Sequence, residues 1–95
     1  MLKSEYSKNI SKRLRKDYPL LSPYFDDMTG YYNIPYEVYS RSKSIRENVK
    51  CLMLDDNFSE NSKECWFMSM FIKEDENLNS YPVISLILGD RSTFL

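Results

Sequence analysis

The sequence predicts an α+β fold in which one or two N-terminal helices pack on a three-stranded antiparallel sheet. Three observations lead to this prediction: a four-residue apolar period at the N-terminus, prolines and turn formers through the middle, and short apolar runs near the end. A length of 95 residues is typical of one domain around a single hydrophobic core. We therefore expect a single domain over 1–95, with a helical and aromatic-loop half at 1–47 and a β-meander half at 48–95.

The N-terminal segment predicts an amphipathic helix over residues 2–16. Its apolar residues recur at every fourth position with polar and basic residues between them, which is the period of a helix with one narrow apolar stripe. The stripe consists of Leu2, Tyr6, Ile10 and Leu14. Pro19 ends the helix, because the residue before a proline avoids the helical conformation.

The middle of the chain predicts an ordered aromatic loop followed by a second helix. Residues 17–33 mix prolines, a glycine and turn formers with large apolar side chains, so we expect a packed loop with one helical turn around Leu20–Phe25. Pro35 suits the first position of a helix, and we favour helix for 35–47. The alternation of polar and apolar residues over 36–43 also suits an edge strand, which stays open as the alternative.

Three short apolar runs in the second half predict the strands of an antiparallel meander. The runs are rich in β-forming residues and are separated by connectors of hairpin length that are rich in Asn, Ser and Glu. They are Val49–Leu54, Cys65–Lys73 and Pro82–Leu88. The last two runs lack the alternation that would leave one face polar, so both faces of the predicted sheet need cover.

This surplus of apolar strand surface predicts contact with another protein. A chain of this length offers at most two helices to cover one face, so either the aromatic loop at 18–33 or a second chain must cover the other. An uncovered face would expose a larger apolar patch than monomers usually tolerate. We therefore expect a homodimer or a dedicated protein partner, bound through the sheet face or through the run at 49–54 as an edge strand.

Four tyrosines between residues 31 and 39 form the densest aromatic feature of the chain. We favour a structural role, in which the rings cover an apolar face of the sheet and keep their hydroxyls at the water. An interface with a protein partner and stacking on nucleic-acid bases are the alternatives. With the aromatic and methionine residues of the predicted middle strand, they give the candidate partner-binding residues Tyr31, Tyr32, Tyr36, Tyr39, Trp66, Met68 and Met70.

Charge is distributed unevenly along the chain and supports a second hypothesis, nucleic-acid binding. Residues 1–50 hold ten Lys and Arg against six Asp and Glu, whereas residues 51–95 hold three against eight. Basic side chains of the first helix could contact phosphates, which dominate such affinities. The candidates are Lys8, Lys12, Arg13, Arg15 and Lys16. The apolar stripe of the same helix needs burial, however, so an ordinary solvated face explains these charges equally well.

Residue types that carry catalysis are scarce. No histidine is present, so the usual general base near neutral pH is missing. Cys51 and Cys65 lie in apolar company and are expected to be reduced, buried and inert. Aspartate pairs at 26–27 and 55–56 fall where turns are expected and give only weak support for a Mg²⁺ site. We therefore expect no catalytic, cofactor-binding or metal-binding residues, and an enzyme is the least favoured class of function.

The function that the sequence favours is that of a small non-enzymatic protein-binding module. A composition rich in Lys, Asn, Tyr and Ile and without Ala resembles that of phage and mobile-element accessory proteins, many of which block a host enzyme or defence complex. We therefore expect an inhibitor that acts by binding a host protein complex, with a nucleic-acid-binding accessory protein as the alternative. No apolar run approaches the length of a membrane span, and the N-terminus lacks the apolar run of a signal peptide. We therefore expect a cytoplasmic protein.

Overall fold

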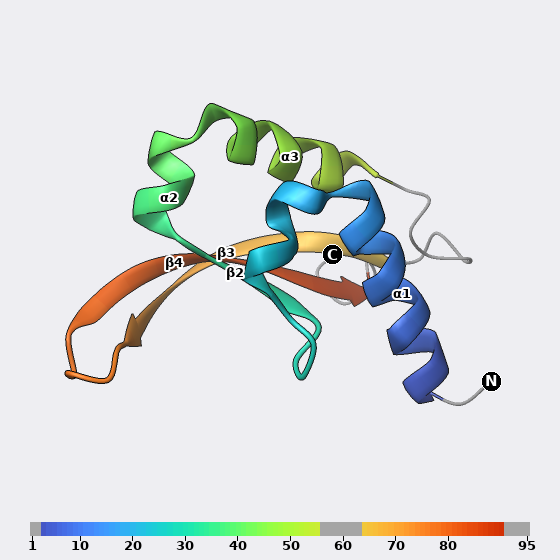
Figure 1. Ribbon diagram of the computed structural model, residues 1–95, viewed down its shortest axis with the longest axis horizontal. Helices are drawn as coiled ribbons and strands as arrows, with labels where there is room; N and C mark the ends of the chain where they lie inside the picture. The colour runs from blue at the N-terminus through green and yellow to red at the C-terminus, as the bar shows by residue number, and fades with distance from the viewer. Residues whose placement is uncertain (1–2, 56–63, 91–95) are drawn as a thin grey trace.

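The computed structural model describes residues 3–55 and 64–90, with side chains from Asn9 onward in the first of these ranges. The elements are α1 (Lys3–Asp17), the 3-10 helix η1 (Pro19–Tyr24), β1 (Phe25–Asp26), β2 (Tyr31–Pro35), α2 (Tyr36–Arg41), α3 (Lys43–Leu54), β3 (Glu64–Glu74) and β4 (Ser80–Asp90). The α+β class, with helices packed on an antiparallel sheet, is confirmed (Figure 1).

The sheet has four antiparallel strands in the order β1-β2-β4-β3, rather than the three expected. β3 and β4 form a long hairpin whose register runs from Glu64 opposite Asp90 to Glu74 opposite Ser80. β2 is much shorter, and its pairing with β4 extends only over residues 83–86 of that strand. The outer part of the hairpin is therefore a two-stranded ribbon that extends beyond the rest of the sheet (Figure 1).

A polar pair joins β2 to β4 near the middle of the sheet. Asn33 lies opposite Ser85 in the register, and the Ser85 hydroxyl donates a hydrogen bond of 2.7 Å to Asn33 Oδ1. Ser85 is a polar residue that is buried between apolar neighbours on β4. The pair satisfies a buried hydroxyl that would otherwise destabilise the sheet.

The expected strand at 49–54 is wrong, because these residues form the second half of α3. Ile45, Val49 and Leu52 recur at helical spacing and are all buried on the side of the helix that faces the sheet. Ser42 caps the helix, since its hydroxyl accepts the backbone N–H of Ile45 at 3.1 Å. The helix expected at 35–47 is confirmed in kind, as α2 and the first part of α3.

β1 and β2 lie in the segment expected to be loop, so that expectation is corrected in part. Tyr32 and Ile34 point into the core while their neighbours are more exposed, which is the alternation of a half-buried strand. Gly30 has a φ of +77°, a conformation that suits glycine and closes the turn between β1 and β2. The helical turn expected around Leu20–Phe25 is confirmed as η1.

α1 is confirmed as a helix, and its apolar stripe faces the core as far as it is described. Leu14 is buried and Ile10 packs against the core, whereas Leu2 and the side chain of Tyr6 lie outside the described part. Beyond the helix, Tyr18 donates a hydrogen bond of 2.7 Å to Asp55 Oδ2 and so joins the end of α1 to the end of α3.

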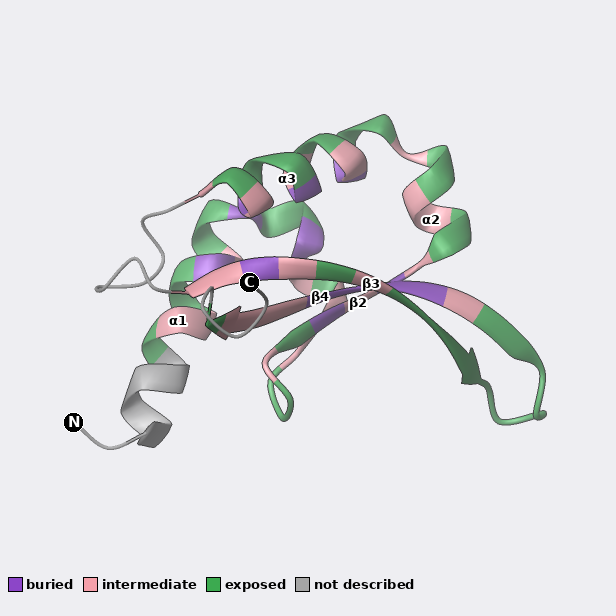
Figure 2. Cartoon of the chain, turned by 180° about the vertical axis from the view of Figure 1, so that it is seen from behind, coloured by how far each residue is buried: buried purple, intermediate pink, exposed green. Residues whose placement is uncertain are grey.

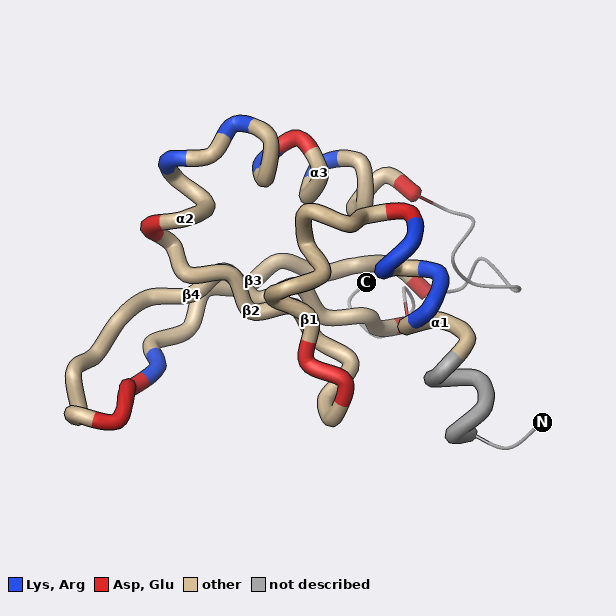
Figure 3. The backbone as a smooth tube through the Cα atoms, in the orientation of Figure 1, with Lys and Arg blue, Asp and Glu red and all other residues tan. Residues whose placement is uncertain are grey.

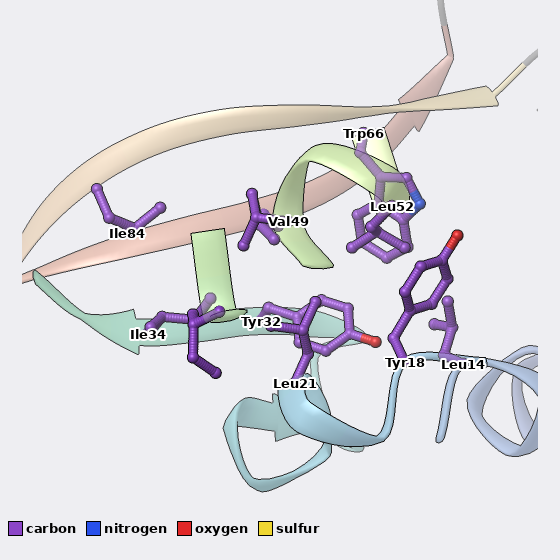
Figure 4. Packing of buried hydrophobic residues seen from close by; sticks show 11 residues of the cluster. Leu14, Tyr18, Leu21, Tyr32, Ile34, Val49, Leu52, Trp66 and Ile84 are labelled. Carbon is purple, nitrogen blue, oxygen red and sulfur yellow. The ribbon is translucent and has the colours of Figure 1, made fainter. Parts of the chain in front are cut away.

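The hydrophobic core lies between the sheet and a single helical layer. α2, α3 and η1 lie on the same side of the sheet, and side chains from six elements meet beneath α3 (Figure 4). The buried cluster consists of Leu14, Tyr18, Leu21, Tyr32, Ile34, Ile45, Val49, Leu52, Trp66, Ile84 and Leu86. Leu21 and Tyr32 come from the aromatic segment, which therefore packs into this core instead of over the opposite face. In the described part of the chain, that opposite face has no helix over it (Figure 2).

Candidate partner-binding surface

The outer part of the β3–β4 hairpin, residues 71–82, protrudes from the domain and is called the arm below. The last residue of β2, Pro35, lies opposite Val83, and Phe71 lies opposite Val83 on the other side, so the arm begins where β2 ends. Every residue from Phe71 to Tyr81 is exposed (Figure 2). Among the described residues, the arm is thus held only by its own two strands.

The turn at the tip of the arm is fixed by hydrogen bonds to Asp75. Its carboxylate Oδ1 accepts the backbone N–H groups of Asn77 at 2.8 Å and Asn79 at 2.9 Å. Its backbone N–H donates to the carbonyl of Asn79 at 3.0 Å, and its carbonyl accepts from Leu78 at 3.0 Å. Because these bonds close the turn internally, the arm presents a preformed tip.

Leu78 occupies the tip in a conformation that leucine rarely adopts. Its φ is +63°, and it is the only residue other than glycine with positive φ among those described. Its side chain is 76% exposed, so no packing within the described chain compensates the strain. Asn77 and Asn79 on either side belong to the type that tolerates this conformation. The fold therefore gains nothing evident from a leucine at this position.

Apolar side chains are concentrated on and beside the arm. Six of the eleven large hydrophobic residues that are exposed in the described part lie between residues 68 and 81. They are Met68, Met70, Phe71, Ile72, Leu78 and Tyr81. Met68, Met70 and Ile72 share one face of β3, and neighbouring exposed apolar side chains of this kind typically mark an interaction site. Of these six residues, only Met68 and Met70 were among the sequence-based candidates. The sequence signal for the others was that apolar residues continue along the hairpin beyond the part that a helix covers.

A recess lies between α2 and the base of the arm. Tyr36 and Tyr81 line it together with the neighbouring prolines, and Glu37 and Arg41 add an ion pair of 3.0 Å. Rings combined with a few polar groups are common where a protein surface receives a partner's side chain. We call this feature the α2 recess.

The structure separates the seven candidate partner-binding residues into two groups. Tyr32 and Trp66 are core residues, 1% and 4% exposed, with ring centroids 5.6 Å apart. Their buried side chains are therefore not available as partner-binding groups. The others lie at or near the surface: Tyr31, Tyr36, Met68 and Met70 are exposed, and Tyr39 is half-buried against the core.

The basic residues of α1 lie at the end of the molecule away from the arm (Figure 3). Lys12, Arg13 and Lys16 are exposed, and Arg13 pairs with Asp17 at 3.5 Å. The side chain of Lys8 lies outside the described residues.

Arg15, the fifth basic candidate, has a structural role. It donates to Ser22 Oγ at 2.9 Å, pairs with Asp27 Oδ2 at 2.7 Å and lies 5.6 Å from the centre of the Phe25 ring. These contacts tie α1 to η1 and to the β1–β2 turn. The cationic surface that α1 can offer is therefore smaller than its sequence indicates.

Charge is absent from the middle of β3. No residue from Cys65 to Ile72 is charged, and the nearest charges toward the tip are those of residues 73–76 (Figure 3). β3 is also the outermost strand of the sheet. An apolar edge strand without charges or proline lacks the usual protection against pairing with another chain.

The cysteines differ from expectation in one respect. Both are free, but Cys51 is exposed and Cys65 is only partly buried, so the expected burial is wrong. The reason for Cys51 is that 49–54 is helical, which turns this residue outward between Val49 and Leu52.

Comparisons of this chain with protein-family models, with curated proteins and with solved structures found no match. Among the helices described, none has both the length and the apolar character needed to cross a membrane. In the same part of the chain, no group of three or more His, Cys, Asp or Glu side chains could hold a metal ion. The geometry that remains as a candidate site is the arm with the α2 recess.

Proposed function

We propose that this protein is a non-enzymatic protein-binding module that engages a protein partner through the tip of the arm and the α2 recess. The observation that carries the proposal is the strained, 76% exposed Leu78 in the hydrogen-bonded turn at the tip of the arm. An exposed leucine in a turn that is closed by hydrogen bonds can enter a pocket of a partner with a smaller loss of conformational freedom than one in an open loop.

The concrete form that we propose is a phage or mobile-element inhibitor that acts in the cytoplasm by binding a host protein complex. This form of the proposal is supported by the composition, together with the exposed arm and the α2 recess. Glu74, Asp75 and Glu76 surround the apolar tip with negative charge. The partner surface that fits this tip is an apolar pocket with basic residues at its rim.

Affinity capture from a lysate of the organism that encodes the protein tests the proposal. The bait series compares the wild type with Leu78→Asp/Tyr36→Ala, which alters the tip and the recess, and with the matched control Lys12→Glu/Lys16→Glu on α1. We expect one protein to be captured by the wild type and by the α1 variant but lost with the tip variant. Capture that survives the tip variant and fails with the α1 variant would move the function to the basic helix, and nuclease-sensitive capture would move it to nucleic acid.

Leu78→Gly is expected to weaken partner binding while leaving the fold intact or more stable. Glycine adopts positive φ without strain, so we expect the free energy of unfolding to stay the same or to rise by about 1 kcal/mol. Loss of an anchor side chain should reduce the affinity for the captured partner by roughly tenfold or more. Urea denaturation and a titration with that partner measure the two effects.

Met28→Gly is the matched control, because Met28 is exposed in the β1–β2 turn, away from the arm. It should leave the affinity unchanged. A Leu78→Gly variant that is clearly destabilised would show that the leucine serves folding, and an unchanged affinity would remove it from the binding surface.

A further inference from the structure

We propose that two copies of this chain join edge to edge through β3, about a two-fold axis at Met70. The inference rests on the proposed function, because it assigns a second partner, another copy of this chain, to the same hairpin. It leaves the tip of the arm and the α2 recess free for the heterologous partner.

The first observation is the unprotected edge itself. β3 is the terminal strand of the sheet and is eleven residues long. The described residues place no strand beside its outer side, and the run from Cys65 to Ile72 contains neither charge nor proline. Natural sheets usually protect such edges with charges, prolines or bulges.

The second observation is the weak support of the arm. Beyond β2, the two strands pair only with each other in the part of the chain that the structure describes, and a two-stranded ribbon is marginally stable in water. Antiparallel pairing of β3 with its copy would place the arm strand of each chain against residues 66–69 of the other. The ribbon would then become the middle of a continuous sheet.

The third observation is a self-complementary register. A two-fold axis perpendicular to the sheet keeps both helical layers on one side and places each side chain opposite one of the same face. Met70 then faces its own copy, and Met68 faces Ile72. All three lie on the face of Trp66, the helix side, and Met70 and Ile72 are 55% and 66% exposed. The most exposed apolar side chains of β3 therefore cover one another.

Polarity favours this axis over the two that lie toward Glu64. An axis at Ser69 would place Glu64 opposite Glu74 at both ends of the pairing, which is repulsive. An axis at Met68 would place Ile72 opposite Glu64. With the axis at Met70, Lys73 and Glu74 face Phe67 and Trp66 of the other copy, so no like charges are opposed.

Cross-linking tests the register. In a Cys51→Ser/Cys65→Ser background, Met70→Cys should form a disulfide-linked dimer under mild oxidation, because directly opposed Cα atoms lie about 4.5–5.5 Å apart. Met68→Cys in the same background is the control, since the two copies of residue 68 would be offset by about 13 Å along the strand. Preferential cross-linking of Ser69→Cys or of Met68→Cys would overturn the axis at Met70.

Light scattering at micromolar concentration tests the association. We expect a dimer for the wild type and a monomer for Met70→Lys, whose two like charges would meet at the axis and raise the dissociation constant by roughly 100-fold. Leu78→Lys adds the same charge outside the overlap and should remain dimeric. A monomeric wild type, or a Met70→Lys variant as dimeric as the wild type, would overturn the inference.

The two proposals fail separately. A monomeric wild type that still loses its captured protein with Leu78→Asp/Tyr36→Ala would leave the proposed function standing without the dimer. A dimer whose capture is unaffected by that tip variant would leave the β3 interface standing and remove the heterologous site at the tip.

Discussion

Trp66→Ala is expected to lower the free energy of unfolding by about 3–5 kcal/mol, the usual effect of removing a large buried aromatic side chain. Trp66 is 4% exposed and packs against Tyr32 in the cluster beneath α3 (Figure 4). Small domains are stable by about 5–15 kcal/mol, so this loss would remove much of the total. Urea denaturation, at a protein concentration low enough to keep the chain monomeric, measures this loss of stability.

Met70→Ala is the matched control, because Met70 lies on the same strand and the same face but is 55% exposed. We expect it to change the stability of the monomer by less than about 1 kcal/mol. Equal losses for the two variants would contradict the assignment of one residue to the core and the other to the surface.

Stability is expected to fall steeply above about pH 10. Burial raises the pKa of Tyr18, with a further contribution from its hydrogen bond to Asp55. Burial also raises the pKa of Tyr32, against a smaller opposing effect of Arg15. The unfolded chain therefore ionises these tyrosines near their ordinary pKa of 10.0 while the folded chain keeps them neutral.

The sign of the pH dependence follows from proton binding. Above about pH 10 the unfolded state binds fewer protons than the folded state, so alkali favours unfolding. Each tyrosine should contribute about 1.4 kcal/mol per pH unit, and the stability should be independent of both below their ordinary pKa.

Denaturation curves between pH 9 and pH 11.5 measure this slope. Tyr18→Phe should reduce it by about half, although it also removes the 2.7 Å hydrogen bond to Asp55 and so lowers the stability at pH 9. A stability that stays flat up to pH 11.5 would show that neither hydroxyl is as buried in solution as in the structure.

Local pattern predicted the helix at the N-terminus and the two long strands, because their periods extend over many residues. The six residues of Val49–Leu54 were ambiguous, since a short apolar run suits a strand and a buried helix equally. Spacing from Ile45 to Val49 and Leu52 was the signal that favoured the helix. β2 was missed because only Tyr32 and Ile34 carry its alternation, among residues that otherwise indicate a turn.

The candidate surface could be predicted only in part for a related reason. Apolar character on both faces of the run at 65–72 drew attention to Met68 and Met70, which are exposed. Trp66 has the same composition around it, and its burial depends on the helix and strand residues that the fold packs against it. The arm itself could not be predicted from the sequence, because its existence depends on how far β2 extends along β4.

The pair of Asn33 and Ser85 helps to fix that extent. A slip of β2 by two residues would keep every side chain on its own face, so the inward and outward pattern alone cannot forbid it. Toward the tip, such a slip would place Asn33 opposite Val83 and would strip the buried Ser85 hydroxyl of its acceptor, at a cost of about 1–3 kcal/mol. This hydrogen bond thus favours the register in which residues 71–82 have no third strand beside them, and the length of the arm is set outward from Ser85.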